Sequence, residues 1–471
     1  MKGLTTTTKV LYGLGFSSQG IKDGLFQIFL FFYFSQVLGL DAALAGTASL
    51  LALMFDAVSD PLVGLLSDKW KSAKWGRRHP FMLVSALPLG VFTYLLFAPP
   101  ESLEQNGLFW WMTSFSVLVR LALTFFIVPH MSLGAELTTD YKERTSVTAY
   151  RIMFAAFISP VIMIIGFLFY FPATEEFSNG LFNKSAYPDF ALLCSILMII
   201  AILVCVYGTK KMIPLLPKLS AEQERLSTTQ LFASLNEAAK MRSFWSLILF
   251  VMMVYVGIGV GVVFSTYFGT YYFEFSTKEM AALPIGSAIG GILALLVAPG
   301  LGERLDKKRA AIYSTVIFAV FFSLPFLLRM IGAFPSNGDP ALLGIYVVTL
   351  IIAYMFLWVS FSLANSMMAD VIDEYELRFK KRQEGLFFAA MSFAFKCTTG
   401  LGQFIAGILL SWIAFPKQAK LGEIPQEAVD GLGMVGGPIL LMFYLSSIIF
   451  ILYYPINKAK YKEIRTVLEA R

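Results

Sequence analysis

The sequence predicts an all-α membrane protein with twelve transmembrane helices in two six-helix halves. Composition is the first reason, because 57% of the 471 residues are hydrophobic and only 14% are charged. Soluble domains average about 45–50% apolar and about 25% charged residues. Long apolar stretches are the second reason, since a helix needs about 20 such residues to cross a bilayer. This composition excludes a soluble enzyme, a disordered chain and a disulfide-stapled secreted domain.

Twelve apolar stretches are long enough to span a bilayer, although polar residues interrupt the first and the tenth. They are 12–38, 44–66, 81–99, 107–133, 149–173, 187–208, 243–272, 280–299, 311–332, 341–368, 386–413 and 434–455. An even number of spans places both termini on one side, and Lys and Arg decide which side. The two tails and the even-numbered loops hold 28 of the 37 Lys and Arg residues, against five in the odd-numbered loops when Arg329, near the end of the ninth span, is counted with them. We therefore predict that both termini are cytoplasmic.

The longest polar segment, 209–242, separates two sets of six predicted spans and is basic at both ends. We expect an N-terminal six-helix bundle over 1–208, a cytoplasmic central linker over 209–242, and a C-terminal six-helix bundle with a short cytoplasmic tail over 243–471.

Metal-binding and catalytic patterns are missing from the sequence. The three cysteines lie in apolar stretches, and His79 and His130 are the only histidines. The chain contains no Ser/His/Asp set, HExxH motif or P-loop. We expect a protein that is not an enzyme, uses no cofactor and binds no nucleic acid.

A loop motif recurs at the same place in each half. In stretches 64–80 and 300–309, a glycine is followed by an acid with a base and then by a basic cluster. This pattern resembles the loop motif of the major facilitator superfamily, whose acid and bases pair when the transporter is closed to the cytoplasm. The resemblance implies a cytoplasmic gate, and ordinary positive-inside charge is the alternative. The gate residues would be Asp68, Arg77, Arg78, Glu303 and Arg304.

Two carboxylates inside the second span are the strongest functional signal. An ionisable group within a span costs about 2.5–3.5 kcal/mol on insertion scales, which makes it a functional pointer. Asp56 and Asp60 are four residues apart and therefore share one helical face. They repel one another unless a cation, a proton or a basic side chain lies between them. The alternative for Asp60 is a capping or pairing role at the cytoplasmic helix end.

Other spans also contain charged or aromatic residues of interest. Lys396 in the eleventh span needs a carboxylate on another helix, Asp56 being the obvious one, unless it snorkels to the interface. Trp358 in the tenth span is placed for a stacking contact. Asp23 in the first span has three candidate partners, which are Lys22, Arg120 and Arg151. Structural pairing and ligand contact both remain open for this group.

Several motifs together resemble the glycoside–pentoside–hexuronide:cation symporters of the major facilitator superfamily. The strongest are stretches 55–64 and 76–81, and similar motifs occur at 136–145, 150–151, 369–375 and 382–385, so the resemblance covers most of the chain.

The resemblance implies roles for particular residues. Asp56 and Asp60 would bind the coupling ion, sodium or a proton, together with Thr124. If the ion is sodium, the two carboxylates would be its metal ligands. Lys396 would lie between the cation and substrate sites, and Arg151 would contact the sugar. By position we add Ser59 to the predicted cation site. The full predicted substrate site is Asp23, Arg120, Arg151, Trp358 and Lys396.

Two departures separate the cation site from the sugar site. A family aspartate that serves both cation and sugar is Ile127 here, and a first-span aspartate that binds sugar aligns with Gly20. Asp23 is a candidate replacement for the latter. The predicted cation residues are thus mostly kept, whereas the sugar contacts are mostly not.

The leading hypothesis is a cation-coupled secondary active symporter that imports a small organic solute by alternating access. A glycoside, pentoside or hexuronide is the first choice of solute. A lysolipid or another amphipathic substrate is the alternative, and a non-transporting sensor is a third possibility. We expect an integral protein of a bacterial inner membrane that acts as a monomer.

Overall fold

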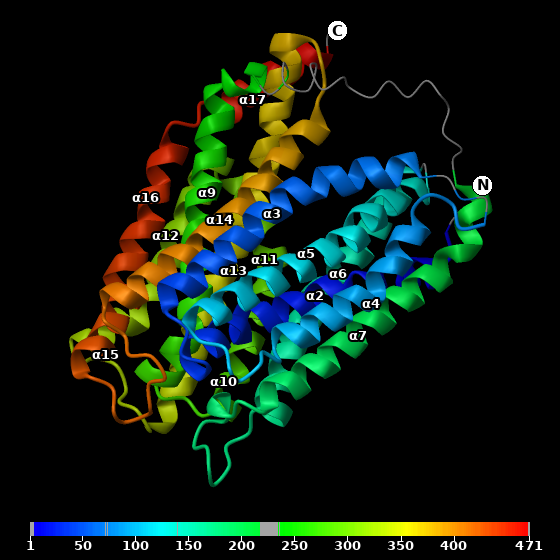
Figure 1. Cartoon of the computed structure of the whole chain (residues 1–471). Coiled ribbons are helices and arrows are strands. Elements are labelled where there is room, and N and C mark those ends of the chain that lie inside the picture. The colour runs from blue at the N-terminus through cyan, green and yellow to red at the C-terminus, as the bar shows by residue number, and fades with distance from the viewer. Residues whose placement is uncertain are drawn as a thin grey trace. The chain divides into compact units, whose positions relative to one another are not determined.

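The computed structural model describes residues 4–70, 72, 74–138, 140–216, 234 and 236–469. These described residues form helices and no β-strand. They pack as two compact units (Figure 1). Unit 1 comprises Met1–Ala221, Ser276–Ala281 and Phe404–Ile424, and unit 2 comprises Glu222–Phe275, Ala282–Gln403 and Pro425–Arg471.

Unit 1 is a bundle of long helices preceded by a segmented helical stretch. Figure 1 shows α3, α4, α5 and α7 alongside one another, and α4 packs on both α5 and α7. The second helix of the chain, α2, packs on α6. The elements are α1 (Thr6–Gly15), α2 (Ser17–Leu25), η1 (Phe26–Leu30), η2 (Tyr33–Val37), α3 (Ala42–Lys69), α4 (His79–Leu96), α5 (Gln105–Glu136), α6 (Tyr141–Ile165), η3 (Gly166–Tyr170), η4 (Gly180–Phe182), α7 (Ala186–Thr209), η5 (Lys210–Leu215) and α10 (Thr277–Met280).

Unit 2 is a second helical bundle. Its α13 packs on both α11 and α12, and α16 packs on α9 and α12. A short C-terminal helix, α17, packs on α13 through the fully buried Ile464. The elements are α9 (Arg242–Tyr267), η6 (Phe268–Tyr272), α11 (Ala282–Arg304), α12 (Lys307–Met330), α13 (Pro340–Phe379), most of α14 (Glu384–Trp412), α15 (Gln426–Met434), η7 (Val435–Ile439), α16 (Leu440–Leu452) and α17 (Lys458–Glu469).

Eleven helices of the described chain are long and apolar enough to cross a membrane. They coincide with the second to the twelfth predicted spans. The first predicted span, 12–38, is also helical, but Phe16 and two π-helical turns divide it into short segments. Most of the predicted central linker lies outside the described residues, so the three-part division of the chain stays a prediction.

The first helical stretch ends in two wide backbone turns. The Leu38 amide donates to the Tyr33 carbonyl at 2.9 Å, and the Leu40 amide donates to the Phe34 carbonyl at 2.8 Å. The Asp41 side chain then caps the start of α3. Together these bonds satisfy backbone groups where one helix ends and the next begins.

The same ending recurs at a constant separation of 235 residues. The Phe273 amide donates to the Phe268 carbonyl at 2.9 Å, and the Phe275 amide donates to the Gly269 carbonyl at 2.7 Å. Ser276 then caps the next helix, α10. The same pair of backbone hydrogen bonds, followed by a side-chain cap on the next helix, therefore occurs in both halves of the chain.

A close helix approach in unit 2 positions α14, the helix that contains Lys396. A Cβ atom on Gly402 would lie 2.4 Å from a carbonyl oxygen of α9, and one on Gly259 would lie 2.6 Å from a carbonyl oxygen of α14. Small residues allow such backbone contact between membrane helices. The two glycines therefore hold α9 and α14 together.

Candidate functional site

Two carboxylates from α3 meet two polar side chains from α5 inside unit 1. Thr124 Oγ1 lies 3.2 Å from Asp56 Oδ1 and 2.9 Å from Asp60 Oδ1. Arg120 Nη1 donates to Asp56 Oδ2 at 3.3 Å. Ser59 Oγ donates to the backbone oxygen of Asp56 at 3.2 Å. We call Asp56, Asp60, Thr124 and Arg120 the acidic cluster.

Helical spacing explains how the acidic cluster forms. Asp56 and Asp60 are one turn apart on α3, and Arg120 and Thr124 are one turn apart on α5, so each pair shares a face. The two helices pack against one another along these faces. Pro61 lies within α3 and has no amide hydrogen, so it frees the carbonyl one turn earlier beside the carboxylates.

The charges of the acidic cluster favour the binding of a cation. Asp56 is 8% exposed and Thr124 is 3% exposed, so water screens their charges and dipoles weakly. The Thr124 hydroxyl has one hydrogen but lies within hydrogen-bond distance of both carboxylates. Two carboxylates and one guanidinium leave one net negative charge within the cluster. A monovalent cation or a proton would neutralise it.

Asp23 pairs with Lys22, one of its three candidate partners. Lys22 Nζ lies 2.5 Å from Asp23 Oδ1, and Gln19 Nε2 donates to Asp23 Oδ2 at 2.8 Å. Arg120, which the sequence offered as another partner, pairs with Asp56 instead. The structure thus resolves the pairing that the sequence left open.

Arg151 lies against an aromatic cluster that ties α1 to α5. Its guanidinium lies 5.2 Å from the centre of the Phe16 ring, and its Nε is buried without a hydrogen-bond partner among the described residues. Tyr12 and His130 stack with ring centres 4.1 Å apart. The Tyr12 hydroxyl donates to the His130 carbonyl at 3.1 Å, and His130 Nε2 lies 2.9 Å from the Tyr12 carbonyl.

Packing explains why no acid occupies position 20. A Cβ atom on Gly20 would lie 2.3 Å from Ile158 and 2.4 Å from the Ala155 carbonyl oxygen on α6. A side chain here would push α2 away from α6. An aspartate at this position would therefore require a different packing of the first helical stretch.

The remaining predicted substrate residues lie in unit 2. Lys396 is half-buried on α14. Trp358 on α13 is 51% exposed, and its ring lies 5.9 Å from that of Phe361. The contacts predicted for Lys396 and Trp358 stay predictions.

An ion-pair cluster in unit 1 contains two of the predicted gate residues. Arg77 Nη2 and Arg78 Nη2 donate to the same oxygen of Glu136, at 2.7 Å and 3.0 Å. Arg78 Nη1 also donates to Ser67 Oγ at 2.9 Å. Our predicted gate set did not include Glu136. The sequence did contain a signal for it. Glu136 follows the fourth predicted span, and Arg77 and Arg78 precede the third, so the predicted topology places all three at the cytoplasmic side. The side chain of Asp68, also predicted for the gate, lies outside the described residues.

The corresponding pair in unit 2 uses a different base from the predicted one. Lys307 Nζ lies 2.7 Å and 2.8 Å from the two oxygens of Asp370, near the end of α13. Arg304 is exposed at the end of α11. The side chain of Glu303 lies outside the described residues. Each unit thus joins the loop after its second span to the end of its fourth.

Further ion pairs surround the end of α13. Arg382 Nη1 lies 3.1 Å from Asp373 and 2.7 Å from Glu376, and Arg382 Nε lies 2.7 Å from Glu384. Hydrogen bonds to Glu384 and Glu376 raise the pKa of Arg382 above its already high usual value. Asp373 and Glu376 lie in the part of α13 that continues to Phe379, beyond the predicted end at 368, and Glu384 begins α14.

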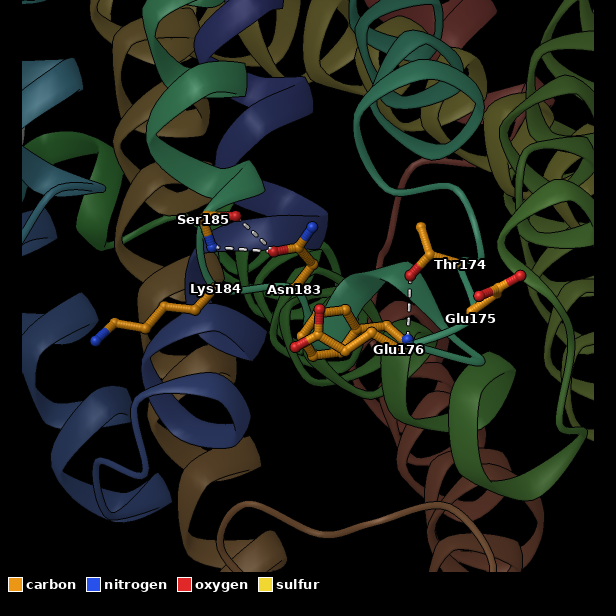
Figure 2. A pocket seen from close by; sticks show the side chains of 7 residues that line it. Thr174, Glu175, Glu176, Asn183, Lys184 and Ser185 are labelled. Atoms are coloured by element: carbon orange, nitrogen blue, oxygen red, sulfur yellow. Dashed lines mark hydrogen bonds between the residues drawn. The ribbon is translucent and has the colours of Figure 1, made fainter.

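A hollow of about 580 Å³ lies on the loop between η3 and α7. In Figure 2 the Lys184 side chain points away from Glu175 and Glu176, and Asn183 accepts bonds from Ser185. None of the predicted site residues lines this hollow. Its lining residues are Thr174, Glu175, Glu176, Phe177, Asn183, Lys184 and Ser185.

Comparisons with known proteins give full-length relatives. The chain is 24% identical to the inner membrane symporter YicJ of Escherichia coli, covering 99% of this chain and 95% of the relative. It is 23% identical to the isoprimeverose transporter of Lactiplantibacillus pentosus, with 96% and 89% covered. It is 22% identical to the glucuronide carrier protein homolog of E. coli, with 99% and 96% covered.

A partial similarity covers a third of the chain. The sodium-dependent lysophosphatidylcholine symporter 1-A of Danio rerio is 30% identical over 156 residues, which are 33% of this chain and 29% of the relative.

A solved structure shares the fold. The nucleoside transporter NupG matches with a TM-score of 0.60 and 16% identity, covering 96% of this chain and 98% of that one. The family described as MFS/sugar transport protein matches residues 11–458. The predicted all-helical membrane fold and the predicted resemblance to cation symporters are therefore confirmed. This chain belongs to the MFS/sugar transport protein family.

Proposed function

We propose that this protein is a cation-coupled secondary active symporter that imports a glycoside, pentoside or hexuronide by alternating access. The observation that carries the proposal is the acidic cluster, in which Thr124 bridges two carboxylates within a membrane-spanning bundle. The names of the full-length relatives, which include an isoprimeverose transporter and a glucuronide carrier homolog, support the substrate class.

The coupling ion, sodium or a proton, binds between Asp56 and Asp60 in this mechanism. Its charge relieves the repulsion between the carboxylates, and Thr124 turns a lone pair toward the ion. Because coupling is reciprocal, a cation that tightens substrate binding by some factor is itself bound more tightly by that factor when substrate is present.

The cytoplasmic gate in this mechanism is formed by the predicted loop residues Asp68, Arg77, Arg78, Glu303 and Arg304. The pairs of Arg77 and Arg78 with Glu136 lie within unit 1 and the pair of Lys307 with Asp370 lies within unit 2, so each holds a loop of its own unit in place. The working unit is a monomer in a bacterial inner membrane with both termini in the cytoplasm. Labelling of introduced terminal cysteines by an impermeant reagent in intact cells tests this orientation.

Uptake into proteoliposomes tests the proposed function. Wild-type protein is given a sodium gradient or a proton gradient, with a panel of labelled glycosides, pentosides and uronides outside. Asp56→Asn should abolish gradient-driven uptake, whereas Asp189→Asn, an exposed acid at the start of α7, should leave it intact. Full uptake by Asp56→Asn would overturn the assignment.

A lysolipid substrate is the second candidate, supported by the partial match to a lysophosphatidylcholine symporter. That match covers a third of this chain, whereas the relatives named for sugar substrates match nearly all of it. A ligand that binds the folded protein must raise its melting temperature. A sodium-dependent shift with lysolipid and none with glycosides would favour this candidate.

A further inference from the structure

The guanidinium of Arg151 lies over an aromatic ring instead of pairing with a carboxylate. Arg151 is ten residues beyond Tyr141, where α6 begins, and its guanidinium lies 5.2 Å from the centre of the Phe16 ring. It also interacts with the Tyr12 hydroxyl, but no carboxylate of the described residues forms an ion pair with it. A cation within a membrane-spanning bundle is costly unless its charge is compensated. The negative face of the Phe16 ring supplies part of that compensation.

The Phe16 ring is itself held by a stack of buried rings. It stacks on His130 with 5.8 Å between ring centres, and His130 stacks on Tyr12 at 4.1 Å. Tyr12 and His130 are fully buried, and two hydrogen bonds join them. A Cβ atom on Gly134 would lie 2.1 Å from the Tyr12 hydroxyl, so a larger residue there would displace the stack. The stack therefore fixes the Phe16 ring against α5.

Phe16 lies at the break in the first helical stretch. It follows the last residue of α1, and its amide donates to the Gly13 carbonyl at 2.9 Å, which is a tighter turn than that of an α-helix. Both α1 and α2 pack on α6, the helix that contains Arg151. The residue at which the two segments meet is therefore the one whose ring contacts Arg151.

We propose that Phe16 is a positioning residue for the transported solute and that it acts through Arg151. This inference rests on the proposed symport function and on the predicted contact between Arg151 and the solute. A carboxylate partner would neutralise the guanidinium and occupy its N–H donors, whereas a ring face attracts the charge and leaves donors at the edge for other partners. Phe16 thus holds Arg151 in place while its donors stay available to the oxygen atoms of a sugar.

Uptake kinetics in proteoliposomes test this role with whichever labelled glycoside, pentoside or uronide of the panel the wild-type protein imports. Phe16→Leu keeps an apolar side chain without a ring, and should raise KM about tenfold with little change in maximal rate. Phe16→Tyr retains a ring and should keep KM near the wild-type value. Tyr453→Leu is the matched control, because the Arg242 guanidinium lies over the Tyr453 ring at the same distance of 5.2 Å within unit 2. This control should leave KM unchanged.

A fluorinated ring separates the charge of the Phe16 face from its shape. A trifluorinated phenylalanine at this position packs as a ring, but the fluorine atoms withdraw electron density from its face and so weaken the attraction to Arg151. KM should therefore rise in this variant as well. A KM equal to that of the wild type would overturn the inference, even if Phe16→Leu does not fold.

Binding of the coupling cation in the absence of solute gives a second measurement. The acidic cluster includes neither Phe16 nor Arg151, so the fluorinated variant should bind the cation with wild-type affinity. Weaker cation binding would indicate that Phe16 supports unit 1 as a whole and would contradict the proposed role.

The remaining outcomes separate this inference from the proposed function. A lower maximal rate with an unchanged KM in Phe16→Leu would mean that Phe16 only stabilises the protein. A smaller loss of solute affinity in Arg151→Gln than in Phe16→Leu would mean that Phe16 does not act through Arg151. Either result would overturn the inference and leave cation-coupled transport standing. If the wild-type protein imports no glycoside, pentoside or uronide of the panel in a cation-dependent way, the proposed function fails, and this inference fails with it.

Discussion

Replacing Arg120 with glutamine is expected to tighten the binding of the coupling cation in the absence of substrate. The guanidinium lies 3.3 Å from Asp56 and competes with the cation for that carboxylate. Two unit charges at this distance attract by about 5 kcal/mol at an effective dielectric constant of ~20 and by about 1.3 kcal/mol at ~80. Their side chains are 13% and 11% exposed, so the true value lies between these limits. Cation affinity should rise about tenfold or more, since each 1.4 kcal/mol is a factor of ten.

Cation titrations of the purified protein provide the assay, with melting temperature or calorimetric heat as the readout. Arg120→Lys preserves the charge and should keep the affinity close to that of the wild type. Cation binding that is unchanged or weaker in Arg120→Gln would refute the view that Arg120 and the cation share Asp56.

Three further outcomes concern stability. Glu136→Gln removes the carboxylate that Arg78 binds in a largely buried site, and should cost about 3 kcal/mol, seen as a lower melting temperature; an unchanged melt would contradict the ion-pair cluster. Gly402→Val should separate α9 from α14 and cost about 1–3 kcal/mol by overpacking, and a wild-type melt would contradict that close approach. Burial alone would raise the pKa of Asp41, but the ion pair with Lys417 lowers it. The ionised Asp41 therefore stabilises the protein fully at pH values above the ordinary pKa of an aspartate. This stabilisation is lost as the pH falls through the lower pKa that Asp41 has in the folded protein. Asp41→Asn should accordingly lower the melting temperature at neutral pH and leave it unchanged in strong acid.

The spans could be predicted well because lipid demands long apolar helices and tolerates few other structures. Composition and length alone located eleven helices that the structure contains. The segmentation of the first span could not be predicted, because a π-helical turn depends on local packing rather than on hydropathy. The extension of α13 was missed for another reason: the carboxylates Asp370 and Asp373 look like loop residues until their partners Lys307 and Arg382 are placed.

The acidic cluster was predictable only in part. A four-residue spacing places Asp56 and Asp60 on one face of a helix whatever the tertiary structure. The pair between Arg120 and Asp56 depends instead on the register of α5 against α3, which a single sequence does not contain. Glu136 was missed for the same reason. Its ion pair with Arg78 depends on how the end of α5 packs against the loop before α4.

The backbone turns that recur 235 residues apart allow the side chains of the two halves to be compared position by position. Counting from Asp56 and Asp60 by the same interval leads to Gly291 and Leu295, neither of which carries charge. The side chains at these positions of the spans thus differ between the two halves, while the backbone hydrogen bonds at the helix ends are the same. Main-chain groups at the end of a membrane helix must be hydrogen-bonded whatever side chains surround them, so one set of bonds can serve two bundles whose side chains differ.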